Sequence, residues 1–122
     1  MIKKIISGGQ TGADQAALDA AISLGIPHGG WIPKGRMTEN GPLSDRYTLQ
    51  EMPTGNYEER TEKNVLDSEG TLIISHGPLT GGSEYTRQMA IQNQKPWTHI
   101  DLDILPAFQA AQQINGWIQK HQ

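Results

Sequence analysis

The sequence predicts an α/β protein with a Rossmann-like, doubly wound and mainly parallel sheet flanked by helices. Short β-branched runs alternate with amphipathic stretches of helical length, an arrangement typical of βαβ units. Two glycine-rich segments each follow a strand-like run and precede a helix-like one. The chain has 122 residues, enough to bury a core and too few for two ordinary domains. We therefore expect one ligand-binding domain, residues 1–122.

The amino-terminal half predicts a strand, a helix and a long loop. Residues 2–6 are a β-branched run, and residues 28–32 and 47–52 predict two further short strands. Residues 33–46 are polar and rich in Gly and Pro, which predicts a loop of a length that is often functional. Residues 12–24 predict a helix whose inner face carries Ala13, Ala16, Ala17, Ala20, Ala21 and Leu24. Thr11 and Asp14 match a capping box at its start.

The carboxyl-terminal half continues the alternation of helices and strands. Residues 56–68 predict a helix capped by Asn56 and Glu59. Strands are expected at residues 70–75 and 96–100, and helices at residues 83–93 and 106–120. The inner face of the last helix is expected at Phe108, Ala111, Ile114 and Ile118. Because this helix comes last, we expect the sheet to lack one final strand.

Composition excludes several classes of function. The formal net charge of −3 gives no basic field for nucleic acid. The chain has no cysteine, which excludes disulfides, thiolate metal sites and cysteine nucleophiles. No apolar run reaches membrane-spanning length, and the first residues do not resemble a signal peptide. We expect a cytoplasmic protein with neither a nucleic-acid nor a membrane partner.

The segment Ser7-Gly8-Gly9-Gln10-Thr11-Gly12-Ala13-Asp14 is the strongest local signal. Placed between a strand and a helix, it offers free backbone amides and a positive helix end to a phosphate group. It matches neither GxGxxG nor the P-loop pattern. For this segment alone, a tight strand-to-helix bend explains the glycines equally well.

A second segment, Gly77-Pro78-Leu79-Thr80-Gly81-Gly82-Ser83, also joins a strand to a helix. In doubly wound sheets the first strand and the strand that starts the second half often lie side by side. Their following loops then flank the crevice where ligands bind. We therefore expect Gln10 and Thr80 to face each other across one pocket for a phosphate-bearing ligand.

Four segments in order resemble the family of molybdenum (molybdenum cofactor) carriers. They are residues 7–14, Gly29-Gly30-Trp31-Ile32-Pro33-Lys34-Gly35-Arg36, Glu59-Arg60-Thr61-Glu62-Lys63-Asn64-Val65 and residues 77–82. The resemblance covers essentially the whole chain. It implies a Rossmann-like superfamily that also contains lysine-decarboxylase-like phosphoribohydrolases and DNA-processing Smf proteins, with a nucleotide-like ligand near the glycine loops.

The predicted binding residues come from both loops and from three cationic positions that the resemblance raises above ordinary surface charges. They are Gly8, Gly9, Gln10, Thr11, Gly12, Asp14, Lys34, Arg36, Arg60, Thr80, Gly81, Gly82 and Ser83. The expected ligand is the molybdenum cofactor (molybdopterin) or a nucleotide. No metal site of protein side chains and no catalytic residues are predicted.

The hydrolase relatives carry a PGGxGTxxE motif whose glutamate helps to cleave an N-glycosidic bond. Here Thr86 falls at that position and cannot act as a carboxylate acid, which favours a binding protein over an enzyme. One alternative is a nucleotide N-glycosidase that uses Glu84 or Asp14. Another is an oligomeric regulatory module, because the superfamily relatives are dimers or tetramers. Weaker candidates are His76 as an acid or base and Asp101 with Asp103 as a cation site.

Overall fold

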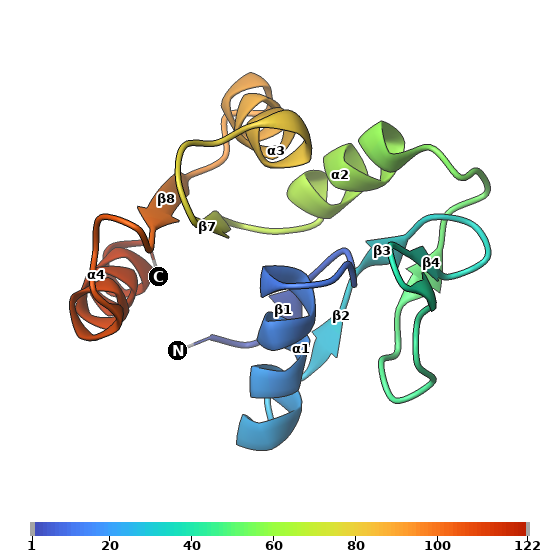
Figure 1. Cartoon of the computed structure of the whole chain (residues 1–122), viewed down its shortest axis with the longest axis horizontal. Helices are drawn as coiled ribbons and strands as arrows, with labels where there is room; N and C mark the ends of the chain where they lie inside the picture. The colour runs from blue at the N-terminus through green and yellow to red at the C-terminus, as the bar shows by residue number, and fades with distance from the viewer. Residues whose placement is uncertain (1, 122) are drawn as a thin grey trace.

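Residues 2–121, the part of the chain that the computed structural model describes, form four helices joined to short strands (Figure 1). The helices are α1 (Ala13–Leu24), α2 (Tyr57–Leu66), α3 (Gly81–Gln92) and α4 (Ala107–Lys120). The strands are β1 (Ile5–Ile6), β2 (His28–Gly29), β3 (Trp31–Ile32), β4 (Met37–Thr38), β5 (Gly41–Pro42), β6 (Gln50–Glu51), β7 (Thr71–Ser75) and β8 (Trp97–Asp101).

Strand pairing confirms the α/β class with mainly parallel strands. The pairs β1–β2, β3–β6 and β7–β8 are parallel, and only β4–β5 is antiparallel among the described residues. Hydrogen bonds group these strands into four separate pairs. Within residues 2–121, β1 is therefore not hydrogen-bonded to β7.

The predicted strand over residues 28–32 is divided into two at Gly30. The φ of Gly30 is +130°, and a Cβ atom there would overlap the backbone of Ser7. This close approach requires glycine and turns the chain between β2 and β3. As a result, β2 pairs with β1 while β3 pairs with β6.

The predicted loop over residues 33–46 contains the hairpin of β4 and β5. The Thr38 hydroxyl donates to the Gly41 carbonyl (2.7 Å) and accepts from the Asn40 amide (3.1 Å), which closes the turn. The strand expected at 47–52 is reduced to β6. Part of the segment that the Gly and Pro content predicted to be an irregular loop is therefore a hairpin, whose turn is held by side-chain hydrogen bonds.

Two clusters of buried side chains form the core. One cluster joins α1 to the β3–β6 region and contains Leu18, Ile32, Leu43, Tyr47 and Leu49. The other lies where α2 and α3 pack against each other and contains Val65, Met89 and Ala90, with Tyr85 and Trp97 against it. Both helices lie side by side at the top of Figure 1.

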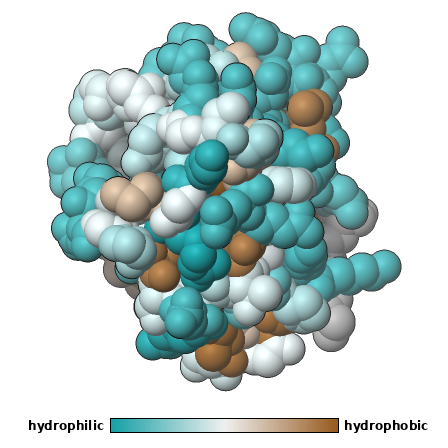
Figure 2. Space-filling view, turned by 90° about the vertical axis from the view of Figure 1, so that its right-hand side faces the viewer, coloured by the Kyte–Doolittle hydropathy of each residue, from teal (hydrophilic) through white to brown (hydrophobic). Residues whose placement is uncertain are grey.

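The predicted inner faces of α1 and α4 are confirmed only in part. Ala21 is buried as predicted, and the predicted Ala17, Ile114 and Ile118 are half-buried. In α1, Leu18 and Ala21 are buried, whereas Leu24 is 72% exposed. In α4, Ala110 is buried and Phe108 is 75% exposed. A leucine buries far more apolar area than an alanine, so Leu18 sets the orientation of α1. On the face in Figure 2, apolar residues form separate patches in a mostly hydrophilic surface.

Helix starts follow their capping residues. The predicted cap of α2 is confirmed, since the Asn56 side chain accepts from the Glu59 amide (3.0 Å). The Glu59 carboxylate accepts from the Thr54 hydroxyl (3.0 Å), which is not the reciprocal bond of a capping box. Helix α3 begins at Gly81, two residues before the predicted start, so Gly81 and Gly82 belong to its first turn.

Candidate functional site

The first glycine-rich loop, residues 7–12, joins β1 to α1 and is held by its own polar groups. The Ser7 hydroxyl donates to the Asp14 carbonyl (2.9 Å), and the Gln10 amide donates to Asp14 Oδ2 (3.2 Å). Gly9 has a φ of +72°, and a Cβ atom there would lie 2.7 Å from Leu49 Cδ1. Backbone conformation and core packing both require glycine at this position.

The amino terminus of α1 is open. Its N-cap is Gly12. Within the part of the chain that the structure describes, no side chain caps this terminus, and a Cβ atom at Gly12 would meet no atom within 4 Å. The predicted capping box is wrong, because Thr11 Oγ1 donates to Glu39 Oε1 (2.8 Å) and the Asp14 carboxylate accepts from Gln10. The first amides of a helix carry its positive dipole end, so this terminus suits an anion.

Arg60 of α2 reaches the first loop. A Cβ atom built at Gly8 would overlap Arg60 Nη1, so the guanidinium lies directly against Gly8. Arg60 Nε is buried and has no hydrogen-bond partner among the described residues. Burial lowers the pKa of Arg60, and the Asp14 carboxylate opposes that shift. The structure therefore brings together Gly8, Asp14 and Arg60, which were predicted from separate parts of the sequence.

The Asp14 carboxyl is the counter-charge of this cluster. Burial raises its pKa most strongly, while Arg60 and the Gln10 amide lower it and Glu39 raises it further. Because Asp14 offsets part of the charge of Arg60, an anion at this loop also needs the helix amides of α1.

Gln10 connects the first loop to the β4–β5 hairpin. Its side chain is buried, and Nε2 donates to the carbonyls of Gly8 (3.3 Å) and Met37 (3.1 Å). Gln10 Oε1 is buried without a partner among residues 2–121. The hydrogen bonding between the loop and the hairpin is therefore incomplete. An unsatisfied buried acceptor costs about 1–3 kcal/mol of folding free energy.

The two predicted cationic site residues of the 33–46 segment, Lys34 and Arg36, differ from Arg60. Arg36 Nη2 donates to the carbonyls of Ser44 (2.9 Å) and Tyr47 (2.8 Å), so this guanidinium braces the turn that ends the segment. The Lys34 side chain is exposed. Sequence alone could not separate these roles, because each depends on contacts with residues distant in the chain.

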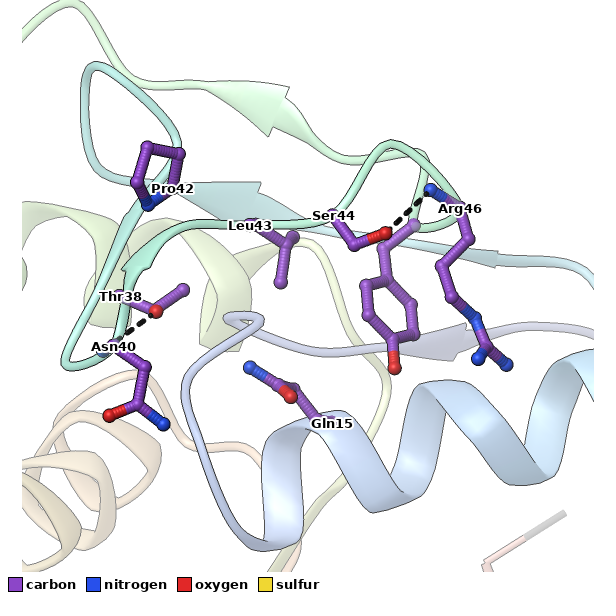
Figure 3. Close-up of a pocket in the computed structure, with 8 residues that line it drawn as sticks. Gln15, Thr38, Asn40, Pro42, Leu43, Ser44 and Arg46 are labelled. Atoms are coloured by element: carbon purple, nitrogen blue, oxygen red, sulfur yellow. Dashed lines mark hydrogen bonds between the residues drawn. The ribbon is translucent and has the colours of Figure 1, made fainter.

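A pocket of about 400 Å³ opens between α1 and residues 38–47 (Figure 3). Gln15 and Leu43 point toward one another across it, Asn40 lies at one end and Arg46 at the other. Gln15 Nε2 also donates to the Gly9 carbonyl (3.2 Å), so the pocket adjoins the first loop. Sequence reasoning named none of these side chains; the only signal was the polar, Gly- and Pro-rich composition of residues 33–46.

The second glycine-rich segment is anchored to β8. The Gly77 amide donates to Asp101 Oδ1 (2.8 Å), and the Thr80 amide donates to Ser83 Oγ (3.2 Å). Gly81 and Gly82 are exposed, with open space where a Cβ atom would lie. Residues 77–83 line neither the pocket beside the first loop nor a second pocket whose lining includes Lys4, His28 and Trp31. The shared pocket of Gln10 and Thr80 stays a prediction.

Residues 5–122 match the model of the circularly permutated YpsA SLOG family. The chain belongs to this family. A crystal structure from Syntrophus aciditrophicus SB, described as a "Putative molybdenum carrier protein", is 62% identical with a TM-score of 0.96. The match covers 98% of this chain and 76% of that one. No curated protein matches the chain. These findings confirm the resemblance seen in the four sequence segments.

This YpsA SLOG family member also pairs a serine at the end of β7 with a histidine in the middle of β8. Ser75 Oγ lies 2.6 Å from His99 Nε2 and 2.7 Å from the Gly77 carbonyl oxygen. A hydroxyl has one hydrogen, so Ser75 donates either to the Gly77 carbonyl or to His99 Nε2, and the tautomer of His99 decides which.

The carboxylates near the second segment are bound to other groups. Glu84 forms a two-point ion pair with Arg87, and these hydrogen bonds lower the pKa of Glu84. Thr86 Oγ1 donates to the Gly82 carbonyl (2.9 Å). An ionised, paired glutamate is a poor proton donor, so the geometry does not favour Glu84 as a general acid.

Among residues 2–121, no three His, Asp, Glu or Cys residues gather so that they could hold a metal ion. The candidate pair Asp101 and Asp103 is not free, since Asp101 Oδ1 accepts from the amides of Gly77 and Asp103 (2.9 Å). Across the same range, no helix has both the length and the apolar character needed to cross a membrane.

Proposed function

We propose that this protein is a carrier for a phosphate-bearing small ligand, either a nucleotide or a pterin such as the molybdenum cofactor. The observation that carries the proposal is the junction of the open α1 terminus with the Arg60 guanidinium at Gly8. Phosphate oxygens accept well from helix amides and from guanidinium groups. The protein from Syntrophus aciditrophicus is described as a molybdenum carrier, and this description favours the molybdenum cofactor as the ligand.

The residues present fit the phosphate of such a cofactor. Arg60 Nε is buried without a partner among residues 2–121, and Gly8 leaves no side chain between the loop backbone and the guanidinium. Gly9, Gln10, Thr11 and Gly12 would supply backbone contacts beside Asp14. When bound, the molybdenum cofactor brings its own sulfur ligands for the metal, which suits a chain without cysteine.

We extend the proposal to the second segment. Gly81 and Gly82 would provide the other side of the site through their amides at the start of α3. Thr80 and Ser83 would flank these amides, because the Thr80 amide donates to Ser83 Oγ (3.2 Å) and the Ser83 amide donates to the Thr80 carbonyl (3.1 Å). Both segments follow parallel strands, and ligands of doubly wound sheets bind beyond the carboxyl ends of such strands. In this proposal Lys34 contributes charge, whereas Arg36 acts by bracing the 44–47 turn.

Ligand screening tests the carrier proposal. Native mass spectrometry and elemental analysis of the purified protein would detect a co-purified phosphate compound or molybdenum. We expect at least one of guanosine monophosphate, adenosine monophosphate and a phosphorylated hydroxymethylpterin to raise the melting temperature, because a ligand of the native state stabilises it by mass action. If nothing co-purifies and none of these compounds raises it, the proposal is wrong.

Substituting Arg60 identifies the phosphate site. Arg60→Lys keeps the positive charge opposite Asp14 but loses the planar fork, so we expect binding to weaken about tenfold, or about 1.4 kcal/mol. Arg87→Lys is the matched control, since Arg87 pairs with Glu84 on α3. Equal affinity in the Arg60 variant and the parent protein would exclude Arg60 from the site.

A second candidate function rests on the raised pKa of Asp14. A buried carboxyl beside a ligand can donate a proton, as in a nucleotide N-glycosidase. Chromatography of nucleoside monophosphates after incubation would detect free base. If the parent protein releases free base and Asp14→Asn does not, the carrier proposal is replaced by an enzymatic one. If the parent protein releases no base, the carrier proposal stands.

We further propose a cytoplasmic, single-domain protein that forms a homo-oligomer, a dimer or a tetramer. The oligomer follows from the resemblance to the superfamily, and an oligomeric regulatory module stays an alternative to the carrier. Light scattering of the purified protein measures the mass of the particle against the 13.4 kDa of one chain. A strict monomer at all concentrations would contradict the oligomer.

A further inference from the structure

We infer that the pocket between α1 and residues 38–47 binds a planar, fused nitrogen heterocycle, while the first loop binds the phosphate of the same ligand. The inference rests on the proposed function and adds the place where the purine or pterin ring of the ligand binds. The pocket shown in Figure 3 has a volume of about 400 Å³, in the range of small-molecule sites.

The pocket and the phosphate loop share walls. Gln15 lines the pocket and also donates to the Gly9 carbonyl. Gln15 belongs to the first turn of α1, two residues after Ala13. On the other side, Thr11 donates to Glu39, which precedes the pocket residue Asn40. A ligand held by its phosphate at the α1 terminus can therefore extend directly into the pocket.

The walls suit the faces and the edge of a flat polar ring. Leu43 and Pro42 supply apolar surface for a ring face. The Asn40 side-chain amide has one acceptor oxygen and two donor hydrogens, and it makes no hydrogen bond within residues 2–121. Purines and pterins carry adjacent donors and acceptors on their edges, which an asparagine amide can match.

The opposite end of the pocket is already ordered. Arg46 Nη2 lies 3.2 Å from Asp19 Oδ1, and its guanidinium lies 5.1 Å from the centroid of the Tyr47 ring. The Tyr47 hydroxyl donates to the same Asp19 oxygen (2.6 Å). Because Asp19 and Tyr47 fix the guanidinium, Arg46 offers a planar cation on which a ring stacks without further ordering.

Calorimetric titration of the full chain tests this inference with three ligands. Ribose phosphate carries the phosphate without a ring, guanosine monophosphate adds a purine, and a phosphorylated hydroxymethylpterin carries the other ring. We expect at least one ring-bearing ligand to bind about tenfold more tightly than ribose phosphate. We expect Asn40→Ala to remove most of that gain. The ring whose ligand gains more affinity over ribose phosphate is the heterocycle, purine or pterin, that the pocket prefers.

Asn115→Ala is the matched control, since Asn115 is exposed on α4. In NMR spectra, amide signals of residues 38–47 should shift with the preferred ring-bearing ligand and not with ribose phosphate. Equal affinity for ribose phosphate and both ring-bearing ligands, or a gain that survives Asn40→Ala, would overturn the inference and leave the carrier proposal standing. Failure of all three ligands to bind would overturn both.

Discussion

Gly8 lies against the Arg60 guanidinium, and its φ lies outside the left-handed region. Alanine is thus compatible with the backbone at this position but would displace Arg60 from the loop. We expect Gly8→Ala to fold and to weaken phosphate binding at least tenfold by calorimetry. Gly55→Ala is the control, because a Cβ atom there meets nothing within 4 Å. Unchanged affinity in Gly8→Ala would show that the guanidinium does not need this position.

Asp101 links stability to pH through the second segment. Its bonds from the Gly77 and Asp103 amides hold its pKa below the ordinary 3.8. A carboxyl with a lowered folded pKa contributes stability above its unfolded pKa, and this is lost as pH falls through the folded value. We therefore expect Asp101→Asn to have a lower free energy of unfolding at neutral pH.

The gap between Asp101→Asn and the parent protein should narrow as pH falls below about 3.8, the ordinary aspartate value. Urea unfolding at a series of pH values measures this gap. Asp45→Asn, at an exposed position, is the control. A gap that stays constant down to the acid range would contradict the role of the Asp101 charge.

At the scale of elements, two glycines in helical segments predict opposite effects. Gly25 ends α1 with a φ of +70°, so Gly25→Ala should cost about 1 kcal/mol of unfolding free energy. Gly116 lies within α4 with open space around a Cβ atom, so Gly116→Ala should add about 0.5–1 kcal/mol. Urea unfolding of both variants checks the two signs. If both substitutions changed the free energy of unfolding in the same direction, the backbone conformation assigned to one of the two glycines would be wrong.

At the scale of the whole molecule, burial separates two large apolar side chains. Leu18 of α1 is fully buried, and Leu18→Ala should cost about 2–5 kcal/mol through lost packing and a cavity. Phe108 of α4 is 75% exposed, so Phe108→Ala should change the unfolding free energy by less than about 1 kcal/mol. A large loss in the Phe108 variant would mean that this face is covered in solution.

The alternation of β-branched runs with helical stretches determined the α/β class from the sequence alone. The Asn56 cap and the four segments that carry the family resemblance were also visible there, because they depend on neighbouring residues. The burial of Leu18 and Ala110 and the exposure of Leu24 and Phe108 were not visible, since all four residues fit a helical stripe.

Only the tertiary structure decided which predicted site residues lie together. In the folded chain the Arg60 guanidinium lies against Gly8 and close to Asp14. The Arg36 guanidinium instead donates to a carbonyl of the 44–47 turn. The tertiary structure also formed a pocket between Gln15 and Asn40, which are 25 positions apart. The periodicity of a sequence predicts local conformation. These contacts join segments that are far apart along the chain, and no local pattern predicts which distant segments meet.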